Sequence, residues 1–150
     1  MCFSTEASFG ASAIILTIGA VCINKSVGLP QRVLSCIPIV FGIQQFAEGI
    51  VWLTLSHPGL TPWDKISTYA FLIFAEVVWP LLVPLAVWLL ETNNRKKKIL
   101  SFFLLSGAIL SCVLGITLLV LPVQSSVSCY HIVYNIQYPQ YLKHLGIFYF

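Results

Sequence analysis

The sequence predicts an all-α fold, a polytopic transmembrane helix bundle with four complete spans and the start of a fifth. Apolar residues make up 58% of the 150 residues and charged residues only 9%, whereas a soluble domain has about 45–50% and about 25%. Four apolar runs are close to the length of about 20 residues that a helix needs to cross the hydrocarbon core. A helix also satisfies its own backbone hydrogen bonds where water is absent.

The four spans are predicted at residues 7–23, 33–55, 62–90 and 99–121, and the connections between them are too short to fold separately. The whole chain is therefore predicted to be a single membrane domain. At the start of the third span, Thr61 is predicted as the N-cap, Pro62 as the first helical residue and Asp64 as an acid in the first turn. Pro80 and Pro84 each remove a backbone donor and are expected to kink this span.

The fourth span carries Gly107, Ser111 and Gly115 at four-residue spacing. Small residues at this spacing let another helix approach closely. The pattern predicts helix packing within the chain, and it also allows a homo- or hetero-oligomer through this face.

The C-terminal part combines interfacial aromatics with an incomplete helix. Tyrosines recur at helix-like spacing in and after residues 129–138, at positions Tyr130, Tyr134, Tyr138 and Tyr141, which is typical of a membrane-interface segment. Pro139 is suited to begin a fifth helix. The 12 residues from Pro139 to Phe150 would extend only about 18 Å as a helix, so we expect a fragment of a longer chain.

The distribution of basic residues predicts the orientation. Lys25 and Arg32 lie in the first connection, and Arg95, Lys96, Lys97 and Lys98 lie in the third. In a four-span trace these connections share a side, which the positive-inside rule makes cytoplasmic. The expected location is the cell membrane, either plasma or inner, with the N-terminus outside. The first residues carry Glu6 and no Lys or Arg, unlike a secretory leader, so the first span is expected to be retained.

Polar side chains within the second and third spans are the main candidates for a functional site. Gln44, Glu48 and Trp52 share one helical face, and Gln45 lies on the adjoining stripe. Glu76 lies at a similar predicted depth in the third span. An ionisable group in a span costs roughly 2.5–3.5 kcal/mol, which favours a functional role. Two interpretations remain open: a site for a proton or cation, or hydrogen bonds that only join the helices.

Histidines and cysteines give weaker predictions. His57, His131 and His144 fall on the outer side, but they lack a standard zinc-ligand spacing. Cys2 and Cys129 are also outside, where a disulfide would be stable if the two Cα atoms were close enough. The sequence contains no nucleophile elbow, P-loop, dinucleotide fingerprint or HExxH motif, it leaves any cofactor unknown, and nothing in it suggests nucleic-acid binding.

Three stretches of the sequence resemble an uncharacterised, mainly bacterial family of integral membrane proteins. They are Met1-Cys2-Phe3-Ser4 with Ala7-Ser8-Phe9-Gly10, Phe41–Gly49 with Val51-Trp52, and Tyr138–Leu145. The resemblance implies further membrane helices beyond this chain, but it implies no activity, ligand or catalytic residue. Family members commonly have a different residue at Glu6, which makes Glu6 a poor candidate for a shared role.

The leading hypothesis is a membrane protein with a buried polar site around Gln44, Gln45, Glu48 and Glu76. This site would bind or conduct a proton, a cation or a small polar ligand. One alternative is a membrane-embedded, metal-dependent lipid hydrolase that uses His131, His144 and carboxylates. Another is a structural subunit with no chemistry of its own.

Overall fold

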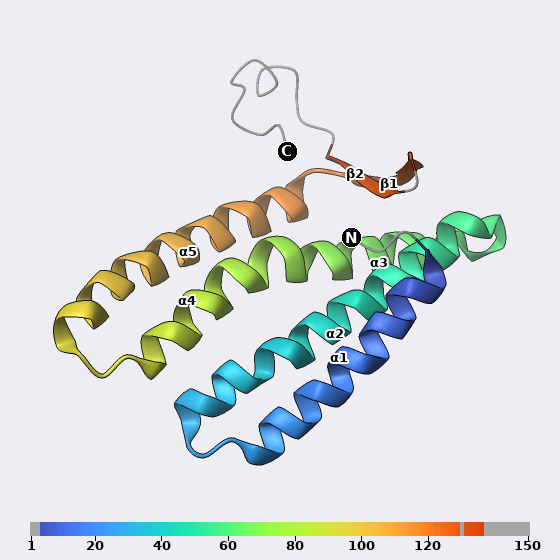
Figure 1. Cartoon of the computed structure of the whole chain (residues 1–150). Helices are drawn as coiled ribbons and strands as arrows, with labels where there is room; N and C mark the ends of the chain where they lie inside the picture. The colour runs from blue at the N-terminus through green and yellow to red at the C-terminus, as the bar shows by residue number, and fades with distance from the viewer. Residues whose placement is uncertain (1–3, 130, 137–150) are drawn as a thin grey trace.

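The computed structural model describes residues 4–129 and 131–136. Four helices in this part of the chain are long and apolar enough to cross a membrane, which confirms the predicted fold class. The elements in order are α1 (Thr5–Lys25), α2 (Leu29–Ser56), the 3-10 turn η1 (Pro58–Leu60), α3 (Thr61–Leu72), the π-helical segment η2 (Ile73–Val78), α4 (Trp79–Leu90), α5 (Asn94–Val120), β1 (Val123–Ser128) and β2 (His131–Ile136) (Figure 1).

The helices pack mainly as a row in which each contacts the next. Helix α1 packs on α2, α2 on α3 and α4, and α4 with η2 on α5. The third predicted span is the continuous run Trp63–Leu90, which consists of α3, η2 and α4. Many large apolar side chains on the outer faces of these helices remain exposed, such as Phe102 and Leu119 on α5. In a membrane these side chains would contact lipid.

Small residues allow α1 and α2 to pack closely. A Cβ added at Gly42 would lie 2.6 Å from Leu16, and one at Gly49 would lie 2.8 Å from Phe9. In the same interface, the Ser12 hydroxyl donates a hydrogen bond of 2.8 Å to the Gly42 carbonyl oxygen. The two glycines at Gly42 and Gly49 therefore bring α1 against the polar part of α2.

The α5 pattern Gly107, Ser111, Gly115 packs within the chain, against η2 and α4. A Cβ at Gly107 would lie 2.0 Å from the Pro80 carbonyl oxygen, and the Ser111 hydroxyl donates a 2.7 Å hydrogen bond to the Val77 carbonyl oxygen. The predicted packing role is thus confirmed. An oligomer through this face would have to displace these contacts.

Two details of the third span differ from prediction. The N-cap is Leu60, without a side-chain cap, so Thr61 is the first helical residue and its prediction as the N-cap is wrong, whereas a proline in the first two helical positions and Asp64 in the first turn agree with the prediction. A kink was expected at Pro80, and the structure has the π-helical segment η2 directly before α4, the helix that contains Pro80. Because Pro80 has no backbone N–H, the regular α-helical ladder lacks a donor there, and a π-turn is one way to accommodate such a break.

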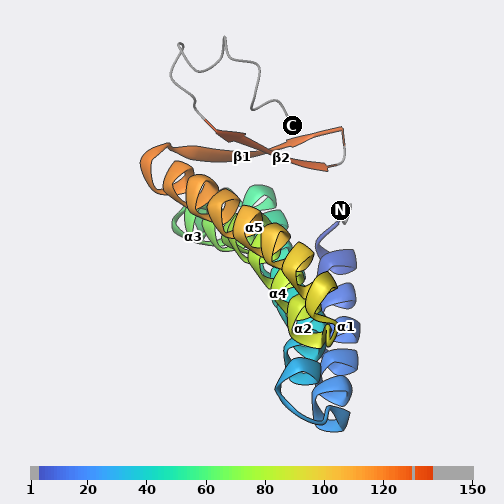
Figure 2. The same cartoon turned by 90° about the vertical axis from the view of Figure 1, so that its left-hand side faces the viewer.

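An antiparallel β-hairpin follows α5, with the register Val123↔Ile136 to Ser128↔His131. It lies past the end of α5 and packs over α3 (Figures 1 and 2). The helix-like tyrosine spacing was therefore misleading for Tyr134, which lies on β2. The other three tyrosines of that pattern, Tyr130, Tyr138 and Tyr141, lie outside the described residues, as does the predicted helix from Pro139.

The two basic connections lie at the same end of the helices, opposite the hairpin. We call this end the basic end and the other the hairpin end. Within the basic end, Lys97 Nζ lies 4.2 Å from the ring centroid of Trp88. The clustering of the basic connections agrees with the four-span trace, and which side of a membrane they face stays a prediction.

Candidate functional site

The polar stripe of α2 is among the most buried surfaces of the described chain. Gln44 and Gln45 are each 6% exposed, Glu48 is 3% exposed and Trp52 is 7% exposed. The stripe lies towards the hairpin end of α2, where α1, α3 and the hairpin all pack nearby. Its predicted inward orientation is therefore correct, and lipid does not reach these side chains.

Side-chain hydrogen bonds connect this stripe within α2 and to the next helix. Gln45 Nε2 donates to Glu48 Oε2 at 3.0 Å, and the indole N–H of Trp79 donates to Gln44 Oε1. The second bond joins α2 to α4 across their interface. Gln44 thus makes a polar contact between apolar helices, which is part of what the structural interpretation predicted, whereas the Gln45 bond lies within α2.

Tyr134 of the hairpin lies over this region. Its ring stacks on Phe71 of α3 with centroids 5.0 Å apart. It packs against the cluster of Val51, Trp52 and Ile132, and also against a second cluster of Leu72, Leu118 and Val123. The hairpin therefore covers the space where α2, α3 and α5 converge.

The hydroxyl group of Tyr134 is buried and has no hydrogen-bond partner in the described structure. Burial, followed by the nearby negative charges of Glu48 and Asp64, raises the pKa of Tyr134 above its usual range. A tyrosine in this setting stays protonated and offers a hydrogen-bond donor. The hairpin therefore brings a phenol within electrostatic range of Glu48, which sequence reasoning did not foresee.

Glu76 is half-buried in the π-helix η2. One carboxyl oxygen, Oε2, is buried without a hydrogen-bond partner among the described residues. Glu76 follows Leu72 by four residues and so shares approximately the same face, and Leu72 packs with Tyr134 beneath the hairpin. Segments of π-helix occur frequently at functional sites.

The helix register places the two carboxylates at comparable depths. Gln44 lies one helical turn from Glu48, and Gln44 accepts the hydrogen bond of Trp79, which follows Glu76 by three residues. Because the two helices run antiparallel, Glu76 and Glu48 lie within about one turn, roughly 5 Å, along the helix axis. Whether they share one site stays a prediction.

A second polar network holds the hairpin to α3. The Thr68 hydroxyl donates to Ser125 Oγ at 3.1 Å, and the Ser125 hydroxyl donates to Asp64 Oδ1 at 2.8 Å. Thr68 is 1% exposed. Asp64, which lies in the first turn of α3 as predicted, thus also accepts a hydrogen bond from β1.

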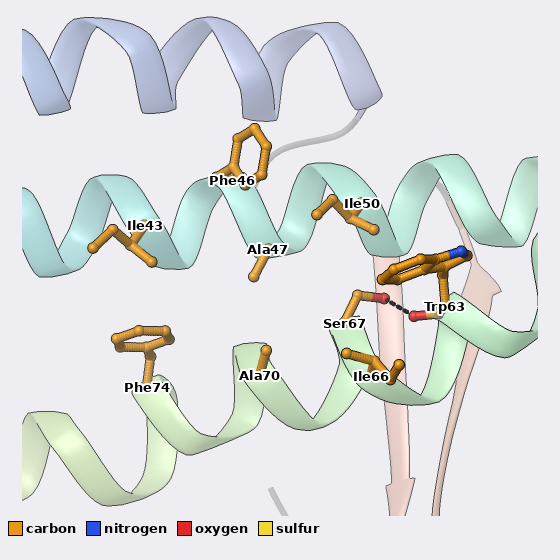
Figure 3. Close-up of a pocket in the computed structure, with 9 residues that line it drawn as sticks. All are labelled: Ile43, Phe46, Ala47, Ile50, Trp63, Ile66, Ser67, Ala70 and Phe74. Carbon is orange, nitrogen blue, oxygen red and sulfur yellow. Dashed lines mark hydrogen bonds between the residues drawn. The ribbon is translucent and has the colours of Figure 1, made fainter.

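A separate groove of about 240 Å³ lies between α2 and α3 (Figure 3). It is lined almost entirely by apolar side chains: Ile43, Phe46, Ala47, Ile50, Trp63, Ile66, Ala70 and Phe74. Its one polar lining residue, Ser67, already donates to backbone carbonyls of its own helix. The groove therefore offers no polar chemistry and is distinct from the Glu48 region.

Of the residues predicted for a metal site or a disulfide, the structure describes His57, His131 and Cys129. His57 Nδ1 contacts the Leu53 carbonyl oxygen and His131 Nδ1 contacts the Cys129 carbonyl oxygen, while His144 lies outside the described residues. In residues 4–129 and 131–136, no three His, Cys, Asp or Glu residues are grouped to hold a metal ion. Cys129 is exposed and unbridged; Cys2 is outside the described range, so that disulfide stays a prediction.

Comparison with known proteins identifies a family for the chain. Residues 1–148 match the model of a family described as "Family of unknown function (DUF6629)". No curated protein and no solved structure matches the chain. The match covers nearly the full length, including the α2 stripe, the hairpin and η2.

Proposed function

Because this chain belongs to the family of unknown function DUF6629, we propose its function from the site alone. The protein is a multi-pass membrane protein whose polar site beneath the hairpin binds a proton, a small cation or a small polar ligand. Glu48 and Glu76 supply the negative charge. The site serves a channel, a transporter or a sensor.

The observation that carries this proposal is the burial of Glu48. Its side chain is 3% exposed in a helix that is long and apolar enough to cross a membrane. Gln44 and Gln45 are buried in the adjacent turn. Helix packing alone would be served by small or apolar residues at these positions, without the desolvation of a carboxyl group.

Two unpaired oxygen atoms support a site over a purely structural network. Glu76 Oε2 and the Tyr134 hydroxyl are both buried without partners among the described residues. A network whose purpose is only to join helices is expected to satisfy its members, because each unsatisfied buried group costs about 1–3 kcal/mol. Unsatisfied groups near a buried carboxylate fit a place that a ligand completes.

The proposed orientation places the basic end in the cytoplasm and the site nearer the outer surface. A variant that retains Cys129 as its only cysteine tests this, because Cys129 is exposed at the hairpin end. A membrane-impermeant maleimide should label it on intact cells. If Cys129 is labelled only after the cells are opened, the hairpin end faces the cytoplasm and the proposed orientation is wrong.

The central experiment compares Glu48→Gln and Glu76→Gln with wild type. The purified proteins are reconstituted into liposomes, and proton and monovalent-cation fluxes are measured under an imposed gradient. A parallel titration records thermal unfolding against pH and cation concentration, which detects binding even without transport. Each substitution should reduce the measured flux at least tenfold, or reduce at least tenfold the rise in unfolding temperature that the ligand produces.

Glu6→Gln is the matched control, since Glu6 is an exposed carboxylate on α1. It should behave as wild type in both assays. If Glu48→Gln and Glu76→Gln keep the wild-type responses and change only the thermal stability, the polar stripe joins helices and the proposal fails.

A further inference from the structure

Ser8 on α1 is a buried polar residue that lies outside the polar stripe of α2. It is 0% exposed, and its hydroxyl oxygen has no hydrogen-bond partner in the described structure. One turn further along, Ser12 is 2% exposed, but its hydroxyl donates to the Gly42 carbonyl oxygen at 2.8 Å. A serine on a helix can normally bond a carbonyl one turn back, so the unpaired Ser8 hydroxyl requires an explanation.

The packing of α1 on α2 determines which part of α2 lies opposite Ser8. Helices α1 and α2 are antiparallel, and Ser12 bonds Gly42, so Ser8 lies about one turn further towards the hairpin end. The Phe9 ring meets Gly49 there. Ser8 therefore lies level with the turn from Gln45 to Gly49, which contains Glu48.

Ser8, Gln45 and Glu48 thus place three types of oxygen at one level. They are a hydroxyl, an amide and a carboxyl group, and all three residues are at least 94% buried. Gln45 already bonds Glu48 at 3.0 Å, and it lies on the side of α2 that carries Gly42 and Gly49, facing α1. The hydroxyl on α1 extends this polar set across the helix interface.

We propose that Ser8 is a further ligand of the site and that the site takes a monovalent metal cation, together with Gln45 and Glu48. This inference rests on the proposed function and narrows its ligand. A proton needs only one acceptor, whereas a hard cation prefers several oxygen ligands. The ligand set of Ser8, Gln45 and Glu48 contains one carboxylate, which balances one positive charge, while a divalent ion held by these three residues alone would leave an uncompensated charge in a poorly solvated site.

The experiment measures Na⁺ binding to the purified full chain in detergent. Radioactive Na⁺ at equilibrium gives the affinity, and thermal unfolding in NaCl, with choline chloride holding the ionic strength constant, gives the stabilisation. Wild type should bind Na⁺ saturably. Ser8→Ala should weaken the affinity at least tenfold, and Glu48→Gln should abolish binding.

Ser12→Ala is the control for a merely structural hydroxyl. It removes a hydroxyl from the same helix face one turn away, so it should lower thermal stability without changing the Na⁺ affinity. A wild-type Na⁺ affinity in Ser8→Ala would overturn the role of Ser8. If Glu48→Gln still abolishes binding in that case, the proposed function stands without Ser8.

The ion itself is tested by replacing Na⁺ with K⁺ or with protons. Competition of K⁺ for bound Na⁺ would keep the assignment to monovalent metal cations. A wild-type protein that responds to pH through Glu48 but binds neither metal ion would overturn this inference and retain the proton-binding form of the proposed function. The absence of every response would defeat both.

Discussion

Substitution Gly107→Ala should destabilise the contact between α4 and α5 strongly, because a single methyl group has no room there. The added Cβ would lie 2.0 Å from the Pro80 carbonyl oxygen. Non-bonded carbon and oxygen atoms need more than about 3 Å, as even weak C–H···O contacts lie at about 3.3–3.6 Å. Since the obstructing atom belongs to the backbone, the two helices must separate by about 1 Å.

That separation also affects the neighbouring hydrogen bond. Ser111 Oγ lies 2.7 Å from the Val77 carbonyl oxygen, and moving α5 away stretches this bond towards its limit. Overpacking typically costs about 1–3 kcal/mol, and an interhelical hydrogen bond in a membrane protein contributes about 0.6 kcal/mol. The free energy of unfolding should therefore fall by about 2–3 kcal/mol.

The assay is reversible unfolding of the detergent-solubilised protein, followed by tryptophan fluorescence. Gly10→Ala is the matched control, because a Cβ at Gly10 meets no atom within 4 Å. It should be neutral or stabilise α1 by up to about 1 kcal/mol. Equal stability of Gly107→Ala and Gly10→Ala would refute the close contact between α5 and Pro80.

Three further predictions concern the site and the hairpin. The pKa of Tyr134 is raised in the folded state. Above about pH 10 the unfolded chain therefore releases a proton that the folded chain retains. The free energy of unfolding should then fall by up to about 1.4 kcal/mol per pH unit. Tyr134→Phe should flatten this dependence of the free energy of unfolding on alkaline pH. An unchanged dependence in the variant would contradict the burial of the Tyr134 hydroxyl. Gln44→Leu removes the acceptor of the Trp79 indole and should lower the free energy of unfolding by about 1–3 kcal/mol, measured by the same fluorescence assay; no loss would mean that this bond is dispensable. Asp64→Ala removes the acceptor of Ser125 and should speed hydrogen exchange in residues 123–136 without affecting α1, whereas unchanged exchange would show that the Asp64 contact does not hold the hairpin.

The four spans were predictable because they depend on properties local to each segment. A run of apolar residues long enough to cross the membrane forms a helix whatever its neighbours are, and an observed helix overlaps every predicted span, although the fourth ends at Val120 rather than at residue 121. The small residues of α5 also predicted close packing. Their partner in the fold, the Pro80 carbonyl, could not be identified from spacing alone.

The hairpin had a signal that the tyrosine spacing obscured. Residues His131-Ile132-Val133-Tyr134-Asn135-Ile136 are rich in β-branched and aromatic types, which favour strands. The turn lacks the usual glycine, and Cys129 instead adopts a φ of 47°, so the common hairpin signature was missing. Pairing with β1 and packing over α3 then decided the conformation.

The sequence by itself determined that the chain forms membrane-length helices and that Gln44, Gln45 and Glu48 share the inward part of one of them. Periodicity and the cost of exposing polar groups to lipid are sufficient for that. Only the tertiary structure decided three features of the polar groups: the Tyr134 phenol lies within electrostatic range of Glu48, the buried Ser8 hydroxyl on α1 is unpaired among the described residues, and Glu76 lies in a π-helix. These groups come from distant segments, and their relative placement depends on helix register and close packing, which no local pattern encodes.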